Sequence, residues 1–343
     1  MRRINARRLF IVLTTVICMP INHNFRAAGV ADAPRRIGSI ERLDPAVDKL
    51  VPADAKMEVI GEGFTWCEGP AWVKDGSFLL FSDIPNNRIM RWDAKSGVKE
   101  YLKPAGYTGD FPRGGESGSN GLVIDNKGRL ILCQHGDRRV ARLNSPLDRP
   151  EPNFVTIADR YNGERFNSPN DAVVHSSGAI YFTDPPYGLE KNVDDPAKEL
   201  PFQGVYRIAP DGKVTLLTRE LERPNGIAFS PDEKTLYVAN SHGERPVIMA
   251  YPVKDDGTLG KGREFFHTNS LKVILEGACD GLTVDKLGNV FATTPGGVTI
   301  FSPEGKRLGT LLSGKRTSNC EFNDDYSTLF ITADDLLLRI RLK

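Results

Sequence analysis

Short runs in which apolar and polar residues alternate make up most of this chain, and turns separate the runs. The stretch 223–241, RPNGIAFSPDEKTLYVANS, shows the pattern. Ile227 and Phe229 alternate with smaller residues, a Ser-Pro-Asp-Glu-Lys segment follows, and Leu236 to Val238 resume an apolar run. Alternation with a period of two on either side of a Pro-Asp turn predicts a hairpin of two short strands.

The same pattern occurs six times, each time with a small polar or acidic residue ahead of the first strand. These six residues, here called the anchors, are Glu68, Asn120, Asn170, Asn225, Asp280 and Asn319. Successive anchors are about 40 to 55 residues apart, which is the length of a four-stranded propeller blade. The chain also has 33 Gly and 23 Pro among its 343 residues, and hardly any apolar pattern of helical period. We therefore predict an all-β fold, a six-bladed β-propeller that forms one domain.

The N-terminus reads as a targeting segment. Four arginines occur among the first eight residues, an apolar run follows from Leu9 to Met19, and small residues stand at 31–33. The run is shorter than the roughly 20 residues that span a bilayer. We predict a signal peptide over 1–33, by the Sec or the twin-arginine route, a lead-in over 34–53 and the propeller over 54–343. The mature protein is then expected to be exported, periplasmic or secreted, with no membrane association.

Charge and cysteine content narrow the possible partners. The formal net charge is +1, with 45 basic and 44 acidic residues and no long block of either sign. Nucleic acid is therefore not expected as a partner. Four cysteines follow the signal segment, and we expect reduced thiols packed between blades, with one disulfide as the alternative. The sequence has no CxxC motif or Cys/His cluster, so a zinc site built from the cysteines is not expected.

Two segments have a predicted place in the ring. Residues 57–60 read as a strand that pairs with the last blade, whose strands are expected at 328–332 and 336–340, and so closes the propeller. The glycine-rich loop 109–121 lacks the lysine and the helix of a phosphate-binding loop. We expect it to lie over the mouth of the channel.

The anchors predict a metal site. The innermost strands of a propeller line its central channel, so residues at the same position in each blade converge at one end. Glu68, Asn170, Asn225 and Asp280 would then bring together four oxygen-bearing side chains and two negative charges. Such a set suits a hard divalent cation, Ca²⁺ above all, with Mn²⁺, Mg²⁺ or Zn²⁺ as alternatives. Each Asn-Gly or Asp-Gly pair taken alone would instead be ordinary turn chemistry.

Five stretches resemble the signature segments of the SMP-30/gluconolactonase/LRE-like family, and especially its bacterial gluconolactonase branch. They are 68–72 (EGPAW), 168–171 (SPND), 181–188 (YFTDPPYG), 223–226 (RPNG) and 279–282 (CDGL). The resemblance implies a six-bladed propeller with one divalent metal, usually calcium, on its axis. It also implies hydrolysis of sugar lactones such as glucono-1,5-lactone to the aldonic acid.

Carried over by motif, Glu68, Asn225 and Asp280 match the metal-binding residues of the family. Asn170 matches an asparagine that binds either metal or substrate. Ser168 stands where the animal members have a substrate-binding arginine, so the substrate contacts are expected to differ.

The chemistry that follows is Lewis-acid polarisation of the lactone carbonyl by the metal. The sequence has no GxSxG nucleophile motif, which agrees with that chemistry. Asp280 is the first candidate for the general base and His135 the second. Asn120, Asn170, His135 and Tyr187 are the candidate substrate-binding residues.

The expected partner is a small-molecule sugar lactone, and the expected assembly is a monomer or a small homo-oligomer. The alternative is a non-enzymatic binding propeller in which the Ca²⁺ ion is structural. A third possibility is an esterase or organophosphate hydrolase on the same scaffold, because propellers host many functions.

Overall fold

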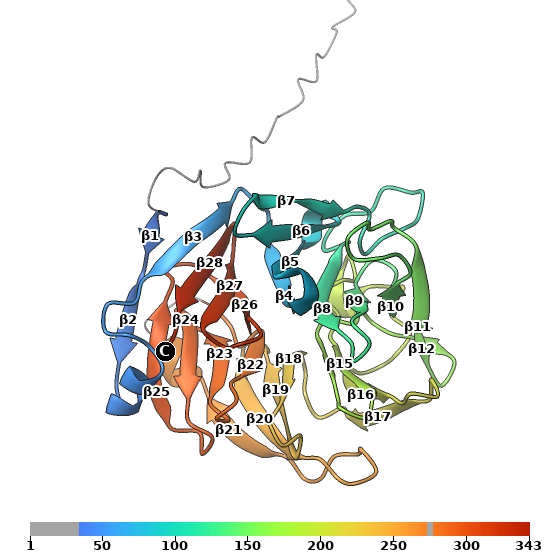
Figure 1. Cartoon of the computed structure of the whole chain (residues 1–343). Coiled ribbons are helices and arrows are strands. Elements are labelled where there is room, and N and C mark those ends of the chain that lie inside the picture. Colours follow the sequence, from blue (N-terminus) through green and yellow to red (C-terminus); the bar gives the residue numbers. More distant parts are fainter. Residues whose placement is uncertain (1–33, 273–276) are drawn as a thin grey trace, which may run out of the picture.

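Six antiparallel sheets are arranged as blades around a central channel in the computed structural model of the chain (Figure 1). The structure describes residues 34–272 and 277–343. The predicted all-β propeller with six blades is confirmed. The predicted signal peptide lies outside the described residues, so the export that it implies stays a prediction.

In the first three blades the strands follow one another from the channel outward. Blade 1 is made of β4 (Cys67–Val73), β5 (Phe78–Asp83), β6 (Arg88–Asp93) and β7 (Gly97–Leu102). Blade 2 is made of β8 (Ser119–Ile124), β9 (Leu130–Gln134), β10 (Arg139–Leu143) and β11 (Phe154–Ala158). Blade 3 is made of β14 (Ala172–Val174), β15 (Ile180–Asp184), β16 (Gly204–Ile208) and β17 (Val214–Thr218).

Blade 4 has four strands like the first three, and blades 5 and 6 take extra strands from the N-terminal segment. Blade 4 is made of β18 (Pro224–Phe229), β19 (Thr235–Asn240), β20 (Val247–Pro252) and β21 (Arg263–His267). Blade 5 is made of β22 (Leu282–Val284), β23 (Val290–Thr294), β24 (Gly297–Phe301), β25 (Arg307–Leu312) and β2 (Ser39–Arg42). Blade 6 is made of β26 (Thr317–Phe322), β27 (Thr328–Ala333), β28 (Leu336–Arg341), β3 (Met57–Glu62) and β1 (Arg36–Ile37).

The ring closes by pairing both ends of the chain in blade 6. Strand β3 lies antiparallel to β28, with Val59 opposite Leu338. This confirms the pairing predicted for residues 57–60, which removes an exposed edge at the junction. The segment predicted as a lead-in contributes to the sheets too. Strand β1 pairs with β3, and β2 pairs with β25, where Ile40 lies opposite Leu311.

Short elements complete the described chain. A two-stranded hairpin is formed by β12 (Arg160–Tyr161) and β13 (Glu164–Arg165). The helical turns are η1 (Pro45–Lys49), η2 (Lys74–Gly76), η3 (Ile84–Asn86), η4 (Asn192–Asp194) and α1 (Asn269–Lys272). Within 34–272 and 277–343, none of these helices is long and apolar enough to cross a membrane.

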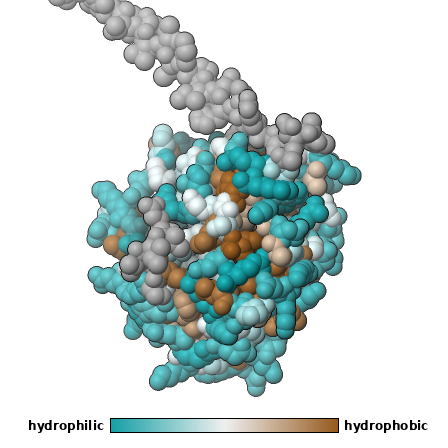
Figure 2. Space-filling view, turned by 90° about the vertical axis from the view of Figure 1, so that its left-hand side faces the viewer, coloured by the Kyte–Doolittle hydropathy of each residue, from teal (hydrophilic) through white to brown (hydrophobic). Residues whose placement is uncertain are grey.

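Apolar side chains are buried mainly between neighbouring blades. Leu80 of blade 1 and Leu132 of blade 2, for example, belong to one buried cluster and are both fully enclosed. Burying a leucine side chain stabilises the fold by about 1.5–3 kcal/mol. The side of the molecule seen in Figure 2 is accordingly mostly hydrophilic, with small apolar areas near its middle.

The four cysteines of the described chain are buried thiols rather than disulfides. This agrees with the expectation that they pack inside the propeller. Cys133 lies in a cluster shared by blades 2 and 3, and Cys320 lies in one shared by blades 5 and 6. Burial raises the pKa of both thiols.

A glycine after the anchor lets each of four blades approach the next one closely. A Cβ added at any of these glycines would collide with the following anchor. The added Cβ would lie 2.1 Å from Asn120 O at Gly69, 2.7 Å from Asn170 O at Gly121, 2.3 Å from Asp280 O at Gly226 and 2.0 Å from Asn319 Cγ at Gly281. The glycines at 121 and 226 lie within strands β8 and β18. Their role is therefore close approach of backbones rather than a turn.

Gly226→Ala should weaken the ring because the new methyl group would collide with the carbonyl of Asp280. We expect a loss of about 1–3 kcal/mol in the free energy of unfolding, as for other overpacked sites. Denaturant unfolding followed by circular dichroism measures this loss. Gly243→Ala is the matched control, since a Cβ there meets nothing within 4 Å. Equal stability of the two variants would contradict the close-approach role.

Candidate functional site

A cavity of about 360 Å³ opens at one end of the channel. Residues of every blade and of several loops line it: Trp66, Glu68, Glu116, Asn120, Asn170, Tyr187, Asn225, Ser241, Gly277, Ala278, Asp280, Arg316 and Thr317. Five of the six anchors are among them. The sixth, Asn319, lies just behind, with its Nδ2 3.3 Å from Glu68 Oε2.

The backbone of the innermost strands fixes the anchors in place. Gly121 N donates to Asn170 O at 2.7 Å, and Gly226 N donates to Asp280 O at 3.1 Å. A hydroxyl on the second strand of one blade supports the next anchor, since Thr183 Oγ1 donates to Asn225 O at 2.7 Å. These three anchors are therefore held by a neighbouring blade, and the ring itself positions this part of the site.

Two of the anchors that line this cavity carry carboxyl groups, Glu68 and Asp280. Burial raises the pKa of Glu68 well above its usual value, and the charge of Asp280 raises it further. Burial also raises the pKa of Asp280, followed by the charges of Glu116 and Asp171. Like charges that are enclosed together are unfavourable unless a counter-charge is present. A divalent cation between them would supply that counter-charge.

The amide anchors present oxygen atoms to the cavity. The ring nitrogen Nε2 of His135 lies 3.5 Å from Asn170 Nδ2, so the nitrogen end of this amide contacts the histidine ring. Asn170 Oδ1, Asn120 Oδ1 and Asp280 Oδ1 are buried without a hydrogen-bond partner. Buried oxygens are normally partnered. Their orphaned state fits a hard cation, which binds carboxylate and amide oxygens.

The predicted ligand set depends on these amides. In the described part of the chain, no three His, Cys, Asp or Glu side chains are grouped so that they could hold a metal ion. Glu68 and Asp280 supply two acidic groups, and Asn170 and Asn225 would supply neutral oxygens. The metal assignment of the four residues stays a prediction, which their shared cavity and the orphaned oxygens of Asn170 and Asp280 support.

Tyr187 lies on the wall of the cavity, where its hydroxyl and that of Ser241 are 2.5 Å apart. Ser241 Oγ also accepts from Asn225 Nδ2 at 3.4 Å. Burial raises the pKa of the Tyr187 phenol, which keeps the hydroxyl neutral near neutral pH. The pair offers neutral hydroxyls to a polar ligand beside the predicted metal ligands.

His135 does not line the cavity. Its ring is fully buried behind Asn170, and its Nδ1 lies 3.2 Å from Glu116 Oε2. The atoms are at ion-pair distance, but Nδ1 has no partner in hydrogen-bond geometry. The structure thus places His135 among residues that orient the site. Its predicted contact with substrate and its catalytic role stay predictions.

Several lining residues were not predicted from the sequence. Glu116, Trp66 and Arg316 come from loops, and Arg316 Cζ lies 4.9 Å from the centroid of the Trp66 ring. Only Glu116 had a signal, because the glycine-rich loop was expected at the channel mouth. Ser168, which replaces the arginine of animal members, is buried and bonds to Pro185 O at 2.6 Å. Its side chain thus serves the fold and is absent from the cavity wall.

Further acidic groups lie near Glu68 and Asp280. Burial raises the pKa of Asp171 to about 6, and Asn319 Nδ2 lies 3.5 Å from its Oδ2. Enclosure by protein raises the pKa of Glu321 to about 8, and the charge of Asp171 contributes to that rise. Protonation of Asp171 and Glu321 therefore lowers the negative charge near the predicted cation site.

Comparisons with known proteins agree with the resemblance seen in the sequence. The family model of the SMP-30/gluconolactonase/LRE-like region matches residues 66–335. The chain belongs to this family. It is 41% identical to a gluconolactonase of Zymomonas mobilis over 318 residues, which are 90% of this chain and 87% of the relative.

Two further relatives extend the comparison. A solved gluconolactonase structure from Xanthomonas campestris superposes with a TM-score of 0.77 and 32% identity, covering 92% of this chain and 99% of the other. Regucalcin of Gallus gallus is 27% identical over 288 residues, which are 82% of this chain and 87% of the relative. The predicted family is thereby confirmed, as is the propeller fold.

The raised pKa of Glu321 predicts a pH-dependent stability. The folded state keeps this carboxyl protonated up to about pH 8, whereas the unfolded chain releases the proton near pH 4. The stability that it contributes is present below about pH 4 and is lost as the pH rises through about 8. Glu321→Gln, which stays neutral, should gain stability relative to the wild type between about pH 5 and 9.

Urea unfolding across that pH range measures the difference. The exposed Glu164→Gln substitution is the control and should show no such trend. A difference between Glu321→Gln and the wild type that does not change with pH would contradict the prediction.

Proposed function

We propose that the protein hydrolyses a sugar lactone such as glucono-1,5-lactone to the aldonic acid with the help of a divalent cation. The four predicted ligands are Glu68, Asn170, Asn225 and Asp280, and Ca²⁺ is the favoured ion. One observation carries the proposal: two enclosed carboxyl groups and orphaned amide oxygens from different blades converge on a cavity that is open at one end.

The relatives support the enzyme class directly and the substrate and the cation less directly. The predicted enzyme class, a lactone hydrolase, is confirmed by the gluconolactonase relatives. A small-molecule lactone as substrate follows from the same relatives. The regucalcin relatives suggest a metal-binding family, which supports a cation as the cofactor.

A divalent cation bound by these residues would polarise the lactone carbonyl and stabilise the negative charge that develops on its oxygen. The protein supplies position and proton transfer. Asn120 lines the cavity beside Asn170 and has an orphaned Oδ1 for a substrate hydroxyl. Tyr187, which follows β15 of blade 3, and Ser241, which follows β19 of blade 4, line the same cavity with their hydroxyls.

Asp280 is the favoured general base because it lines the cavity and its Oδ1 is buried without a partner. In the proposed step, a water oxygen bonds to the carbonyl carbon while its proton passes to the Asp280 carboxylate. The bond from that carbon to the ring oxygen then breaks, and the ring oxygen takes the proton. The products are an open-chain hydroxyl and a carboxylic acid, which loses its own proton to solvent. His135 stands behind Asn170 and lacks such direct access.

Lactone hydrolysis by chelated protein tests the proposal, with Ca²⁺, Mn²⁺, Mg²⁺ or Zn²⁺ added back and spontaneous opening subtracted. Wild type should regain activity with the cation. Asp280→Asn and Asn225→Ala should lose at least about 100-fold in kcat/KM, as when one transition-state contact is removed. Asp255→Asn, on an exposed loop, is the control. A wild type that binds the ion and gains thermal stability but hydrolyses no lactone would instead indicate a binding propeller with a structural ion.

Cation affinity should depend on pH. Burial raises the pKa of both Glu68 and Asp280 when no cation is bound, so protons compete with the ion for these carboxylates. Ca²⁺ affinity should therefore fall as the pH is lowered from about 8 to about 5.5. Isothermal titration calorimetry at the two pH values measures it. Equal affinities at both would show that these carboxylates do not hold the ion.

A further inference from the structure

One loop brings a carboxylate into the cavity from outside the ring of anchors. Residues 103–118 connect β7 to β8, and Glu116 of this loop lines the cavity together with Asp280 and Tyr187. Its side chain is 35% exposed, so it is open to a ligand. Its Oε2 lies 3.2 Å from Nδ1 of His135, and Nε2 of the same ring lies 3.5 Å from Nδ2 of Asn170, which places the carboxylate beside the anchors.

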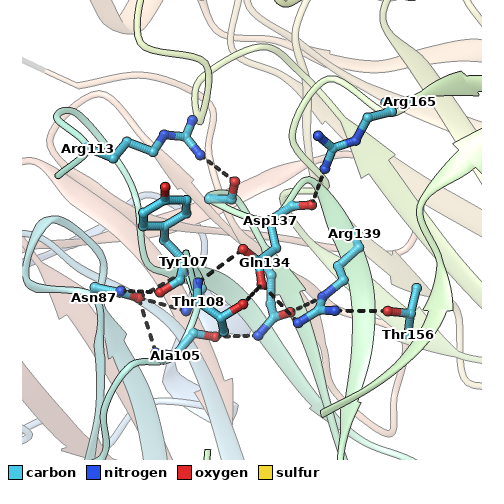
Figure 3. Close-up of polar contacts among 12 residues, drawn as sticks. Asn87, Ala105, Tyr107, Thr108, Arg113, Gln134, Asp137, Arg139, Thr156 and Arg165 are labelled. Atoms are coloured by element: carbon cyan, nitrogen blue, oxygen red, sulfur yellow. Dashed lines mark hydrogen bonds and ion pairs between the residues drawn. The ribbon is translucent and has the colours of Figure 1, made fainter. Parts of the chain in front are cut away.

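The loop is fixed at its base by a polar network (Figure 3). Asn87 Oδ1 accepts hydrogen bonds from the backbone of Ala105, Gly106 and Tyr107, at 2.7 to 3.1 Å. Thr108 Oγ1 donates to Asp137 Oδ2 at 2.7 Å. The base of the loop is therefore held by blade 1 on one side and blade 2 on the other.

Arg113 holds the part of the loop nearest to Glu116. Its guanidinium donates to the carbonyl oxygens of Gly136 and Gly188, and its side chain is only 13% exposed. Figure 3 shows Arg113 extending from the loop towards a backbone oxygen above the Tyr107 ring. Gly136 follows His135, and Gly188 follows Tyr187. One side chain thus ties the Glu116 loop to the segments that carry His135 and Tyr187.

The chemistry of this arrangement suits hydroxyl recognition. A carboxylate accepts strong, charge-assisted hydrogen bonds from hydroxyl groups. Several hydroxyls distinguish a sugar lactone from an unsubstituted lactone with the same ring. The reacting carbonyl, in contrast, has no hydrogen to donate to Glu116. A fixed carboxylate beside Asp280 therefore reads the substituents of the ring rather than its ester group.

We propose that Glu116 binds hydroxyl groups of the substrate and makes the enzyme selective for polyhydroxylated lactones, and that Arg113 is the positioning residue for Glu116. The proposal rests on the proposed lactone hydrolysis and deepens it. It adds a specificity residue that lies outside the repeat of anchors, on a loop between two blades.

The test compares glucono-1,5-lactone with δ-valerolactone, which has the same ring without hydroxyls, at saturating Ca²⁺. Glu116→Ala should lower kcat/KM for the sugar lactone about 10- to 100-fold, mainly through KM, because charge-assisted hydrogen bonds are lost. The loss on δ-valerolactone should be smaller by about 10-fold or more, because only the effect of the Glu116 charge on Asp280, which is common to both lactones, remains there. Glu116→Gln, which keeps the size but not the charge, should fall between Glu116→Ala and the wild type.

Arg113 variants test the positioning role. Arg113→Ala should reproduce the selectivity loss of Glu116→Ala, and Arg113→Lys should restore part of it because an ammonium still donates to the carbonyls. The exposed Arg149→Ala substitution is the control and should behave as the wild type. Circular dichroism separates loss of fold from loss of selectivity. If Arg113→Ala does not fold, Arg113→Lys and the two Glu116 variants still decide the matter.

Equal losses on both lactones, or no loss on either, would overturn the proposal, since Glu116 would then serve the reaction itself or nothing. If wild type opens the sugar lactone but not δ-valerolactone, the inhibition constant of δ-valerolactone replaces its turnover in the comparison. A wild type that hydrolyses neither lactone, nor any other on the panel, would count against the proposed function, and the selectivity proposal would fall with it.

Discussion

The close approach of the six innermost strands is the constraint on which the site depends. Four of the six anchors are followed by a glycine, and a Cβ at each would collide with the next anchor in the ring. This approach narrows the channel until side chains from different blades share one cavity. Residues more than 200 positions apart in sequence, such as Glu68 and Asp280, therefore act on the same small volume.

Convergence has an electrostatic cost that explains the chemistry. Burial raises the pKa of both Glu68 and Asp280. The charge of Asp280 adds to the rise at Glu68, and the charges of Glu116 and Asp171 add to the rise at Asp280. Orphaned amide oxygens lie at the same cavity. A cation relieves this repulsion and at the same time provides a Lewis acid. The loop with Glu116 is superimposed on this symmetric arrangement and makes the cavity different on one side.

The features that repeat from blade to blade could be predicted from the sequence, and most of those that occur once could not. Alternating strands and regularly spaced anchors predicted the blades, the closure by residues 57–60 and the convergence of Glu68, Asn170, Asn225 and Asp280. The pairing of β1 and β2 with two blades was not predicted, because strand pairing at an outer edge depends on where the closed ring leaves space. Arg316 and Glu116 lie on loops outside the repeat. Contacts such as those of Arg113 place these loops, and such contacts cannot be predicted from the spacing of the repeats. The anchors' glycines looked like turn residues until the neighbouring backbones were in place.

A crystal structure of the protein with Mn²⁺, analysed by anomalous scattering, would show whether the anchors bind a cation. We expect one strong peak on the channel axis, within roughly 2.0–2.6 Å of carboxylate oxygens of Glu68 and Asp280 and of the amide oxygens of Asn170 and Asn225. At least one coordination position should face the open cavity, where a lactone carbonyl would bind. A fully loaded crystal without a peak between these residues, or with its ion bound elsewhere, would show that the anchors do not form a cation site.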